Sequence, residues 1–279
     1  MAHATTASEP GSTSTIPPTR RFFRLVKGIV LRSDAIYRLN LRARFGAATL
    51  SQTPGVNVMN GTLKSRAEWQ AAFQRARALH MPLHRGEEKN WDHLAAVSTI
   101  LANTARSARI LDAGAEIYSN VLSTLFLYGY RELHGINLSF SAPTRRGPIR
   151  YIPGDLTHTP YPDSFFDAIT CLSVIEHGVP LPEYFREMYR LLKANGLLIT
   201  STDYHPIPID TRGQMTHGTP IKIFSRADIE SALELAKAAG FELTGQVDLS
   251  SEETPIRWEP FGLEYTFLLF TLRKPAQDP

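Results

Sequence analysis

The sequence predicts an α/β protein with a doubly wound, mostly parallel sheet of seven strands, an antiparallel edge strand and an N-terminal helical extension. From residue 105 onward, short apolar runs alternate with stretches of helical periodicity, which is typical of a parallel sheet covered by helices on both faces. The chain ends in two apolar runs, 241–249 and 264–272, with little structure predicted between them, and this favours an antiparallel pair at one edge. The 279 residues, 43% of them hydrophobic, are enough for a large core.

The elements of this main domain, predicted over 105–275, follow from the apolar runs and the helical spacing between them. The first five strands are predicted at 109–111, 133–138, 149–152, 166–174 and 196–202, and the helices at 119–128, 181–192 and 225–239. The link 139–148 contains Pro143 and Pro148 and is too short for a crossover helix, so we predict an irregular loop there.

The first 104 residues divide into a tail and a helical extension. Residues 1–19 contain few large apolar groups, and we expect them to be disordered because they can bury too little surface to offset their ordering entropy. Within the extension, 20–104, helical spacing predicts a helix over 65–80. Asn90 is expected to cap a further helix over 91–102.

A strongly basic stretch opens this extension, since Asp34 is the only acidic residue between Arg20 and Arg44. Apolar residues are interleaved with the basic ones, which indicates an amphipathic helix. Two interpretations are open. The helix packs on the main domain with its arginines in solvent, or it contacts an anionic membrane or a protein partner.

Composition and charge exclude several classes of protein. The formal net charge of +3 argues against a dedicated nucleic-acid binder, which needs positive charge over a broad face. Cys171 is the only cysteine, so no disulfide forms within the chain, and its apolar surroundings predict a core position. No apolar run reaches the roughly 20 residues of a membrane span, and the first basic residues, Arg20 and Arg21, come too late for a secretory signal. We therefore expect a cytoplasmic protein.

Polar residues follow five successive predicted strands, at the edge where a doubly wound sheet binds its ligands. These residues lie at 112–116, 135–139, 154–156, 173–177 and 203–205. Gly114 would let the backbone turn and approach a ligand closely. Five such groups at one edge of the sheet predict a binding site there.

Six motifs stand in a fixed order along these segments. They are Ile-Leu-Asp-Ala-Gly-Ala at 110–115, Gly-Asp-Leu at 154–156, Phe-Asp-Ala-Ile at 166–169, Ser-Val-Ile-Glu-His at 173–177, Leu-Leu-Lys-Ala-Asn-Gly-Leu-Leu at 191–198 and Gly-Phe at 240–241. The set resembles the class I S-adenosylmethionine-dependent methyltransferases, in particular those of type 11. The resemblance extends over about 105–275 and implies S-adenosylmethionine as the cofactor.

The resemblance implies roles for residues at the first two strand ends. Asp112 and Gly114 would lie at the turn that holds the methionine portion of the cofactor. The family has glycines where this chain has Glu116 and Tyr118, so the turn must be shaped differently, and Glu116 could reach the cofactor's ammonium group. Asn137 takes the place of the acidic residue that grips the ribose, and its hydrogen bonds lack the strength that a charge adds.

At the later strand ends, the resemblance implies contacts with the rest of the cofactor. Asp155 and the backbone of Leu156 would face the adenine, and Ser173 would run beneath the cofactor. His177 would lie at the rim, near the sulfonium or the acceptor.

A catalytic base is needed only if the acceptor must lose a proton, because the methyl group of the sulfonium is already activated. Candidate catalytic residues are His177, His205 and Asp203, with Tyr204 as a further possible base. Glu176 is interpreted as a carboxylate that starts a helix or packs.

The acceptor pocket is expected from the loop 205–224, the segment 250–262 and the N-terminal helices. Their residues suggest a small polar or glycan-like acceptor that is methylated on oxygen or nitrogen. No metal site is predicted, because no known spacing is matched by the four possible ligands Asp203, His205, Asp210 and His217.

Two alternatives come from other classes of function. A nicotinamide-dependent oxidoreductase would need Gly-x-Gly-x-x-Gly after the first strand, where Glu116 would repel the pyrophosphate. A catalytically inactive methyltransferase-like protein would act as a binding or scaffold module. Glu116 and Asn137 favour that alternative, whereas Asp112, Gly114 and Asp155 oppose it.

Overall fold

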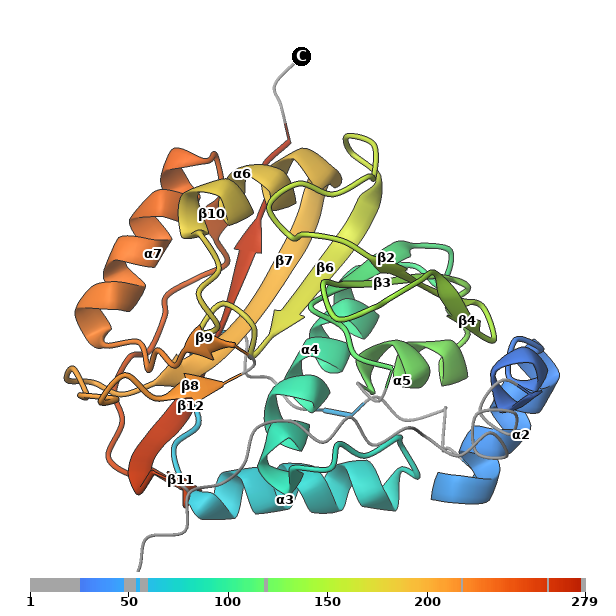
Figure 1. The fold of residues 1–279 in the computed structure, drawn as a ribbon, viewed down its shortest axis with the longest axis horizontal. Helices are drawn as coiled ribbons and strands as arrows, with labels where there is room; N and C mark the ends of the chain where they lie inside the picture. Colours follow the sequence, from blue (N-terminus) through green and yellow to red (C-terminus); the bar gives the residue numbers. More distant parts are fainter. Residues whose placement is uncertain are drawn as a thin grey trace, which may run out of the picture.

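The computed structural model describes residues 26–47, 54–55, 60–117, 120–216, 218–259 and 261–276. The predicted disordered tail, residues 1–19, lies outside this part of the chain, as do Tyr118 and His217. Within the described residues, one large mixed sheet runs through the molecule with helices on both of its faces (Figure 1).

Five parallel strands form the centre of the sheet, in the spatial order β5-β3-β2-β6-β7. They are β2 (Arg109–Ala113), β3 (Glu132–Asn137), β5 (Ile149–Pro153), β6 (Phe166–Leu172) and β7 (Leu192–Tyr204). The long β12 (Leu263–Arg273) pairs antiparallel with β7. The predicted doubly wound sheet is therefore confirmed. Its switch point lies at β2, because the chain passes first to β3 on one side and later to β6 on the other.

Short strands extend the sheet beyond the predicted seven. β1 (Gly61–Thr62), β10 (Glu242–Leu243) and β11 (Ile256–Trp258) pair with β12, and β4 (Thr144–Arg146) pairs with β5. The link 139–148 is thus not irregular throughout, because Gly147, with φ +52°, closes a hairpin between β4 and β5. The strand predicted over 241–249 is reduced to β10, because Gly245, with φ +94°, turns the chain away from β12.

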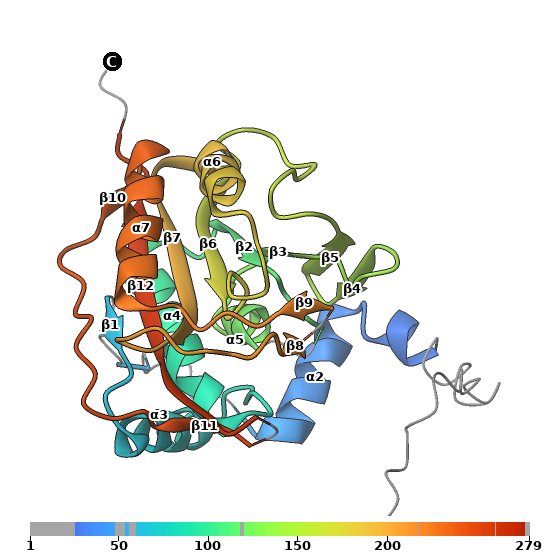
Figure 2. The same ribbon diagram turned by 60° about the vertical axis from the view of Figure 1, so that its left-hand side comes forward.

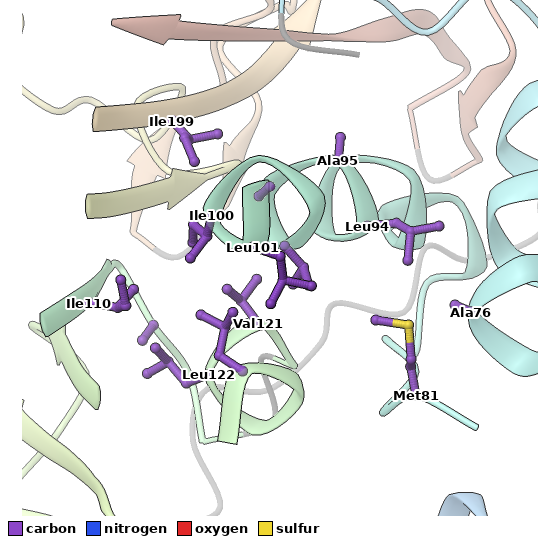
Figure 3. Packing of buried hydrophobic residues seen from close by; sticks show 14 of the residues in the cluster. Ala76, Met81, Leu94, Ala95, Ile100, Leu101, Ile110, Val121, Leu122 and Ile199 are labelled. Carbon is purple, nitrogen blue, oxygen red and sulfur yellow. The ribbon is translucent and has the colours of Figure 1, made fainter. Parts of the chain in front are cut away.

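Helices cover the sheet on both faces. On one side lie α2 (Asp34–Phe45), α3 (Arg66–Ala78), α4 (Asn90–Asn103) and α5 (Val121–Leu127), and on the other α6 (Leu181–Leu191) and α7 (Arg226–Ala238). Neighbouring strand residues face opposite sides, so Ile110 belongs to the first core and Leu111 to the second. Figure 3 shows the first core, where Ile110 and Ile199 of the sheet lie close to Ile100 of α4 and Val121 of α5.

Asn90 is the first residue of α4 and not its N-cap, so the predicted capping role was wrong. Lys89 occupies the cap position, at the end of the short helix η1 (Glu87–Lys89). The Asn90 side chain instead accepts a hydrogen bond from the His84 N–H at 2.9 Å and donates one to the Glu87 carbonyl at 2.8 Å. These bonds hold the segment before α4 in place and thereby fix the position of Lys89.

Two further expectations concern the core and the membrane. Cys171 is buried in the second core, as its apolar surroundings predict. Among the helices that the structure describes, none combines the length and the apolar character that crossing a bilayer requires.

A small separate sheet, formed by β8 (Met215–Thr216) and β9 (Thr219–Pro220), follows β7 and lies near the carboxyl edge of the main sheet (Figure 1).

Candidate functional site

A cavity of about 750 Å³ lies at the carboxyl ends of β2, β3, β5, β6 and β7. Eight of the ten predicted site residues line it, namely Gly114, Glu116, Asn137, Asp155, Leu156, Ser173, His177 and Asp203. Asp112 and His205 do not. Residues around the start of α4 and from β11 and β12 line the cavity as well. The cavity therefore lies where a doubly wound sheet binds its ligands.

The turn after β2 brings the backbone to the cavity at Gly114. This residue has φ +86°, and a Cβ at its position would collide with the side chain of Val174. Glycine is thus required both for the backbone conformation and for the close approach of the segment after β6. Beyond the turn, Glu116 projects a carboxylate to the cavity lining.

Asp112 lies beneath this turn instead of at the cavity surface. It is buried within the sheet and accepts a hydrogen bond from the Thr170 hydroxyl of β6 at 2.8 Å. The direct cofactor contact expected of Asp112 therefore does not follow from the geometry. Its bond across two neighbouring strands supports the turn at Gly114 from below.

Asn137 and Asp155 form the side of the cavity at the ends of β3 and β5. The Asn137 amide donates to the Gly114 carbonyl at 2.9 Å and accepts from the Ser139 N–H at 2.8 Å. It therefore ties the two neighbouring strand-end loops together. Asp155 accepts from the Thr157 N–H and hydroxyl, both at 2.8 Å, which fixes the loop before the buried Leu156.

Ser173 follows β6 in a left-handed backbone conformation, with φ +52°. Its N–H donates to the Ser201 carbonyl at 3.0 Å, and its hydroxyl accepts from the Lys89 ammonium. A non-glycine residue in this conformation costs free energy and persists where the surroundings hold it in place. Here the hydrogen bonds from two other elements do so.

Lys89 carries a positive charge at the inner wall of the cavity. Its ammonium lies 3.5 Å from a carboxylate oxygen of Asp203 and 3.7 Å from the centroid of the Phe267 ring. Burial lowers the pKa of Lys89, but the carboxyl groups of Asp203, Asp92 and Glu176 outweigh this effect, so that its pKa is raised. Lys89 therefore stays charged and holds Asp203 in place.

The buried Glu176 and the partly buried Asp203 form a pair of acids beside Lys89. Burial, followed by the negative charge of Asp203, raises the pKa of Glu176 to about 8, although Lys89 acts in the opposite direction. Burial also raises the pKa of Asp203, and Lys89 opposes that shift. Because like charges in one buried site cannot easily ionise together, Glu176 holds a proton at neutral pH. The Thr202 hydroxyl lies 3.2 Å from its carboxyl group.

The predicted catalytic residues are separated by the fold. His177 and Asp203 line the cavity, whereas His205 lies on the following loop, where its imidazole bonds the Ile207 carbonyl at 2.8 Å. Tyr204 is fully buried, and its hydroxyl donates to the Leu249 carbonyl at 2.9 Å. Successive residues of β7 point to opposite faces of the sheet, which separates Tyr204 from the cavity that Asp203 lines.

The remaining wall of the cavity is more apolar. Trp258 and Tyr265 come from β11 and β12, and Thr219 and Ile221 come from the loop after β7. The loop 205–224 and the segment 250–262 are expected to form the acceptor pocket. Of their described residues, Thr219, Ile221 and Trp258 line the cavity. The Trp258 ring packs edge-on against Phe261, with 4.5 Å between ring centroids, which fixes the orientation of the indole.

Sequence reasoning missed Lys89 and did not foresee that the interpreted packing carboxylate Glu176 lies buried beside Asp203. Glu176 carried one signal, its place among polar residues just after a predicted strand. Lys89 carried none, because it lies 84 residues before Ser173, and only the folded chain brings the two together. Within the described residues, which exclude His217, no three His, Cys, Asp or Glu side chains are arranged to hold a metal ion.

Comparison with known proteins adds a family to this geometry. Residues 111–200 match the family described as a methyltransferase domain. The chain is 25% identical over 118 residues to the sterol 24-C-methyltransferase erg-4 of Neurospora crassa, covering 40% of this chain and 31% of that protein. It is 28% identical over 138 residues to the sterol 24-C-methyltransferase of Pneumocystis carinii, covering 45% of this chain and 33% of that protein. The matched part is thus about a third of the length of these relatives.

A solved structure shares the fold. The crystal structure of the cyclase SpnF superimposes with a TM-score of 0.50 at 17% identity, covering 78% of this chain and all of that one. At this level of identity the likeness concerns the fold alone, and a fold by itself does not fix the reaction.

Proposed function

Because the chain carries a class I S-adenosylmethionine-dependent methyltransferase domain, we propose that it transfers a methyl group from this cofactor to a small acceptor bound in the same cavity. The observation that carries the proposal is the cavity of about 750 Å³ at the carboxyl edge of the sheet. Its size falls in the range of roughly 300–1,000 Å³ that small-molecule sites occupy. A cavity lined by the acid pair of Glu176 and Asp203 also favours catalysis over the scaffold alternative.

The donor groups of the cavity fit S-adenosylmethionine. Glu116 offers a carboxylate for the ammonium group, and Asn137 retains hydrogen-bonding capacity for a ribose hydroxyl. Asp155 and the neighbouring Leu156 offer a polar and an apolar contact for the adenine, and Ser173 lies between this side and Lys89. The carboxylates also suit a ligand that carries a positive sulfonium.

When bound, the cofactor supplies a methyl group that is already activated, so the protein must position the acceptor, exclude water and accept a proton. Asp203 is the group best placed to accept the proton, because Lys89 holds its carboxylate at the cavity wall. Glu176, protonated at neutral pH, keeps a second negative charge from building up beside it. His177 is a second proton acceptor at the rim.

The acceptor wall suggests a molecule with an apolar or flat body and one protic oxygen or nitrogen. Trp258, Tyr265 and Ile221 would contact the body, and Asp203 would contact the protic group. This differs from a purely polar or glycan-like acceptor. The named relatives are sterol methyltransferases, but the acceptor-wall residues lie outside the matched stretch 111–200, so the family match leaves the acceptor open.

Calorimetric titration with S-adenosylmethionine and with its demethylated product tests the proposal. We expect micromolar binding by the wild type. Glu116→Gln should weaken it by roughly 10–100-fold, since a hydrogen bond to a charged group contributes about 1.5–3 kcal/mol. Glu234→Gln, at an exposed position on α7, is the matched control and should bind like the wild type.

One result would reject the proposal, and another would revise the site proposed for the cofactor. Absence of binding to either ligand by folded wild-type protein would reject methyl transfer and support a scaffold role. Equal binding by Glu116→Gln and the wild type would retain the proposed cofactor but show that Glu116 does not contact it.

A further inference from the structure

The segment 26–45 is fixed to the edge of the domain through one of its sides. It consists of a short helical stretch, 26–30, and α2, with a turn between them. Tyr37 and Leu41 are buried, and the Tyr37 hydroxyl bonds the Ser123 hydroxyl of α5 at 2.7 Å. The Tyr37 ring also stacks on Phe126, with 5.6 Å between centroids. The inner side of the segment is therefore part of the core.

Polar contacts complete this attachment. Asp34 forms an ion pair with Arg131, and Arg38 lies over the Phe126 ring at 4.5 Å. The Gly147 N–H donates to the Leu31 carbonyl at 2.8 Å, which joins the segment to the β4–β5 hairpin. In Figure 2, α2 and the stretch before it lie at the outer edge of the molecule beside β4. The opposite side of the segment consequently has a fixed orientation.

That opposite side exposes aliphatic side chains. We call it the outer face, and its apolar members are Val26, Ile29, Val30, Ile36 and Leu39. They make up half of the ten large hydrophobic residues found exposed in the described part of the chain, although they lie within 14 consecutive positions. Leu39 is 66% exposed and Ile29 54%. Apolar exposure that is clustered rather than scattered marks an interaction surface.

Basic side chains flank these aliphatic ones. Lys27, Arg32, Arg42 and Arg44 are exposed, and Asp34, the one acidic residue of 26–45, is engaged by Arg131. On α2, helical spacing places Ile36, Leu39 and Arg42 along one side, and Arg32 lies in the turn just before the helix. The outer face thus combines an apolar centre with positive margins.

We propose that the outer face binds an anionic lipid surface, with its aliphatic side chains among the acyl chains and its basic side chains among the headgroups. Segments of this composition lie in the membrane interface, where each basic residue contributes about 1 kcal/mol through anionic lipid. Protein interfaces are instead enriched in aromatic anchors and depleted in lysine. The apolar members of the outer face are all aliphatic, which favours lipid as the occupant.

Co-sedimentation of the full chain with vesicles tests this proposal. Vesicles of phosphatidylcholine containing about a quarter phosphatidylglycerol should bind the wild type, and pure phosphatidylcholine should bind it weakly. The double variant Ile36→Asp/Leu39→Asp should bind anionic vesicles roughly tenfold or more weakly. It removes two aliphatic groups that would enter the acyl chains, and it adds negative charge. Leu235→Asp, the same kind of change at an exposed leucine of α7, should bind like the wild type.

A charge variant separates the two contributions. Arg32→Gln/Arg42→Gln should lose much of the preference for anionic over neutral vesicles and much of the dependence on salt. Circular dichroism establishes that each variant is folded, and binding of S-adenosylmethionine by the aspartate variants keeps this test separate from that of methyl transfer.

Three outcomes would overturn the proposal. Wild-type protein that binds no vesicles would do so, as would aspartate variants that bind as well as the wild type. Sedimentation that reveals a dimer of the wild type, abolished by the aspartate variants, would assign the outer face to a second copy of this chain.

Discussion

Glu176 lies in the turn after β6, and its carboxyl group is buried beside Asp203 and Lys89. In the unfolded chain the same carboxyl group is hydrated, and its pKa is near 4.5. Folding removes the water and adds a neighbouring acid, which together outweigh the attraction of Lys89. The proton that Glu176 holds at neutral pH is thus a property of the tertiary structure, with a measurable effect on stability.

We predict that the free energy of unfolding falls between pH 6.5 and 8 and that Glu176→Gln removes much of this fall. The folded pKa, about 8, lies above the unfolded value, so the folded state binds more protons in this window and stability decreases as pH rises. The expected loss is on the order of 1–2 kcal/mol. Urea unfolding at the two pH values measures the difference.

Below pH 6.5, other buried groups change the free energy of unfolding in the opposite direction, so the test begins at pH 6.5. Burial lowers the pKa of His93 and of His134 to about 4, so both stabilise the folded state as pH rises toward their ordinary value of 6.5. Above pH 6.5 only about 0.4 kcal/mol per histidine remains to be gained, which is less than the loss expected from Glu176. Glu234→Gln serves as the control, and an unchanged slope in Glu176→Gln would refute the assignment.

At the scale of elements, capping residues decide where α7 begins. Ser225 accepts a hydrogen bond from the Asp228 N–H, and Asp228 accepts from the Ser225 N–H at 2.9 Å, which makes a complete capping box. The sequence predicts this helix from residue 225, and the structure begins it at Arg226. Local hydrogen bonding is therefore sufficient to set this boundary. At α4 it is not, because Asn90 is drawn into bonds with the preceding segment.

Ser225→Ala should lower the free energy of unfolding by about 1 kcal/mol, within the range of 0.5–2 kcal/mol for the loss of a capping side chain. Ser231→Ala, at an exposed interior position of the same helix, is the matched control. It should leave stability unchanged or raise it slightly, because alanine is the better helix former. Denaturant titration of both variants tests the prediction, and equal stabilities would mean that the box contributes nothing.

At the scale of the whole molecule, the cavity is assembled from segments that are far apart in sequence. Lys89 precedes the first parallel strand, Asp203 ends β7, and Tyr265 belongs to β12. They meet because β12 pairs with β7 and because α4 begins at the carboxyl ends of the parallel strands. A ligand in this cavity contacts many parts of the fold at once.

Ligand binding should therefore stabilise the entire chain against unfolding. S-adenosylmethionine at about 100 times its dissociation constant should raise the free energy of unfolding by about 2.7 kcal/mol, provided that the unfolded chain does not bind it. Thermal unfolding with increasing cofactor measures the effect. Glu116→Gln should need a proportionally higher concentration for the same shift. A midpoint that does not respond to saturating cofactor would contradict the proposed site.

The sequence alone determined the five parallel strands, the long last strand and the three helices of the main domain, because apolar periodicity and capping residues are local properties. It also determined most of the cavity edge, because the carboxyl ends of parallel strands must meet on one side. Gly114, Asp155 and Ser173 are found this way.

Only the tertiary structure decided which of these residues the cavity exposes and what surrounds them. Asp112 is turned into the sheet, His205 lies beyond the cavity, and Lys89 arrives from 84 residues before Ser173. It also decided that Glu176 is protonated and that five aliphatic residues of 26–39 remain outside the core. The physical reason is the same in each case. Burial and electrostatic environment depend on contacts between distant segments, which no local pattern encodes.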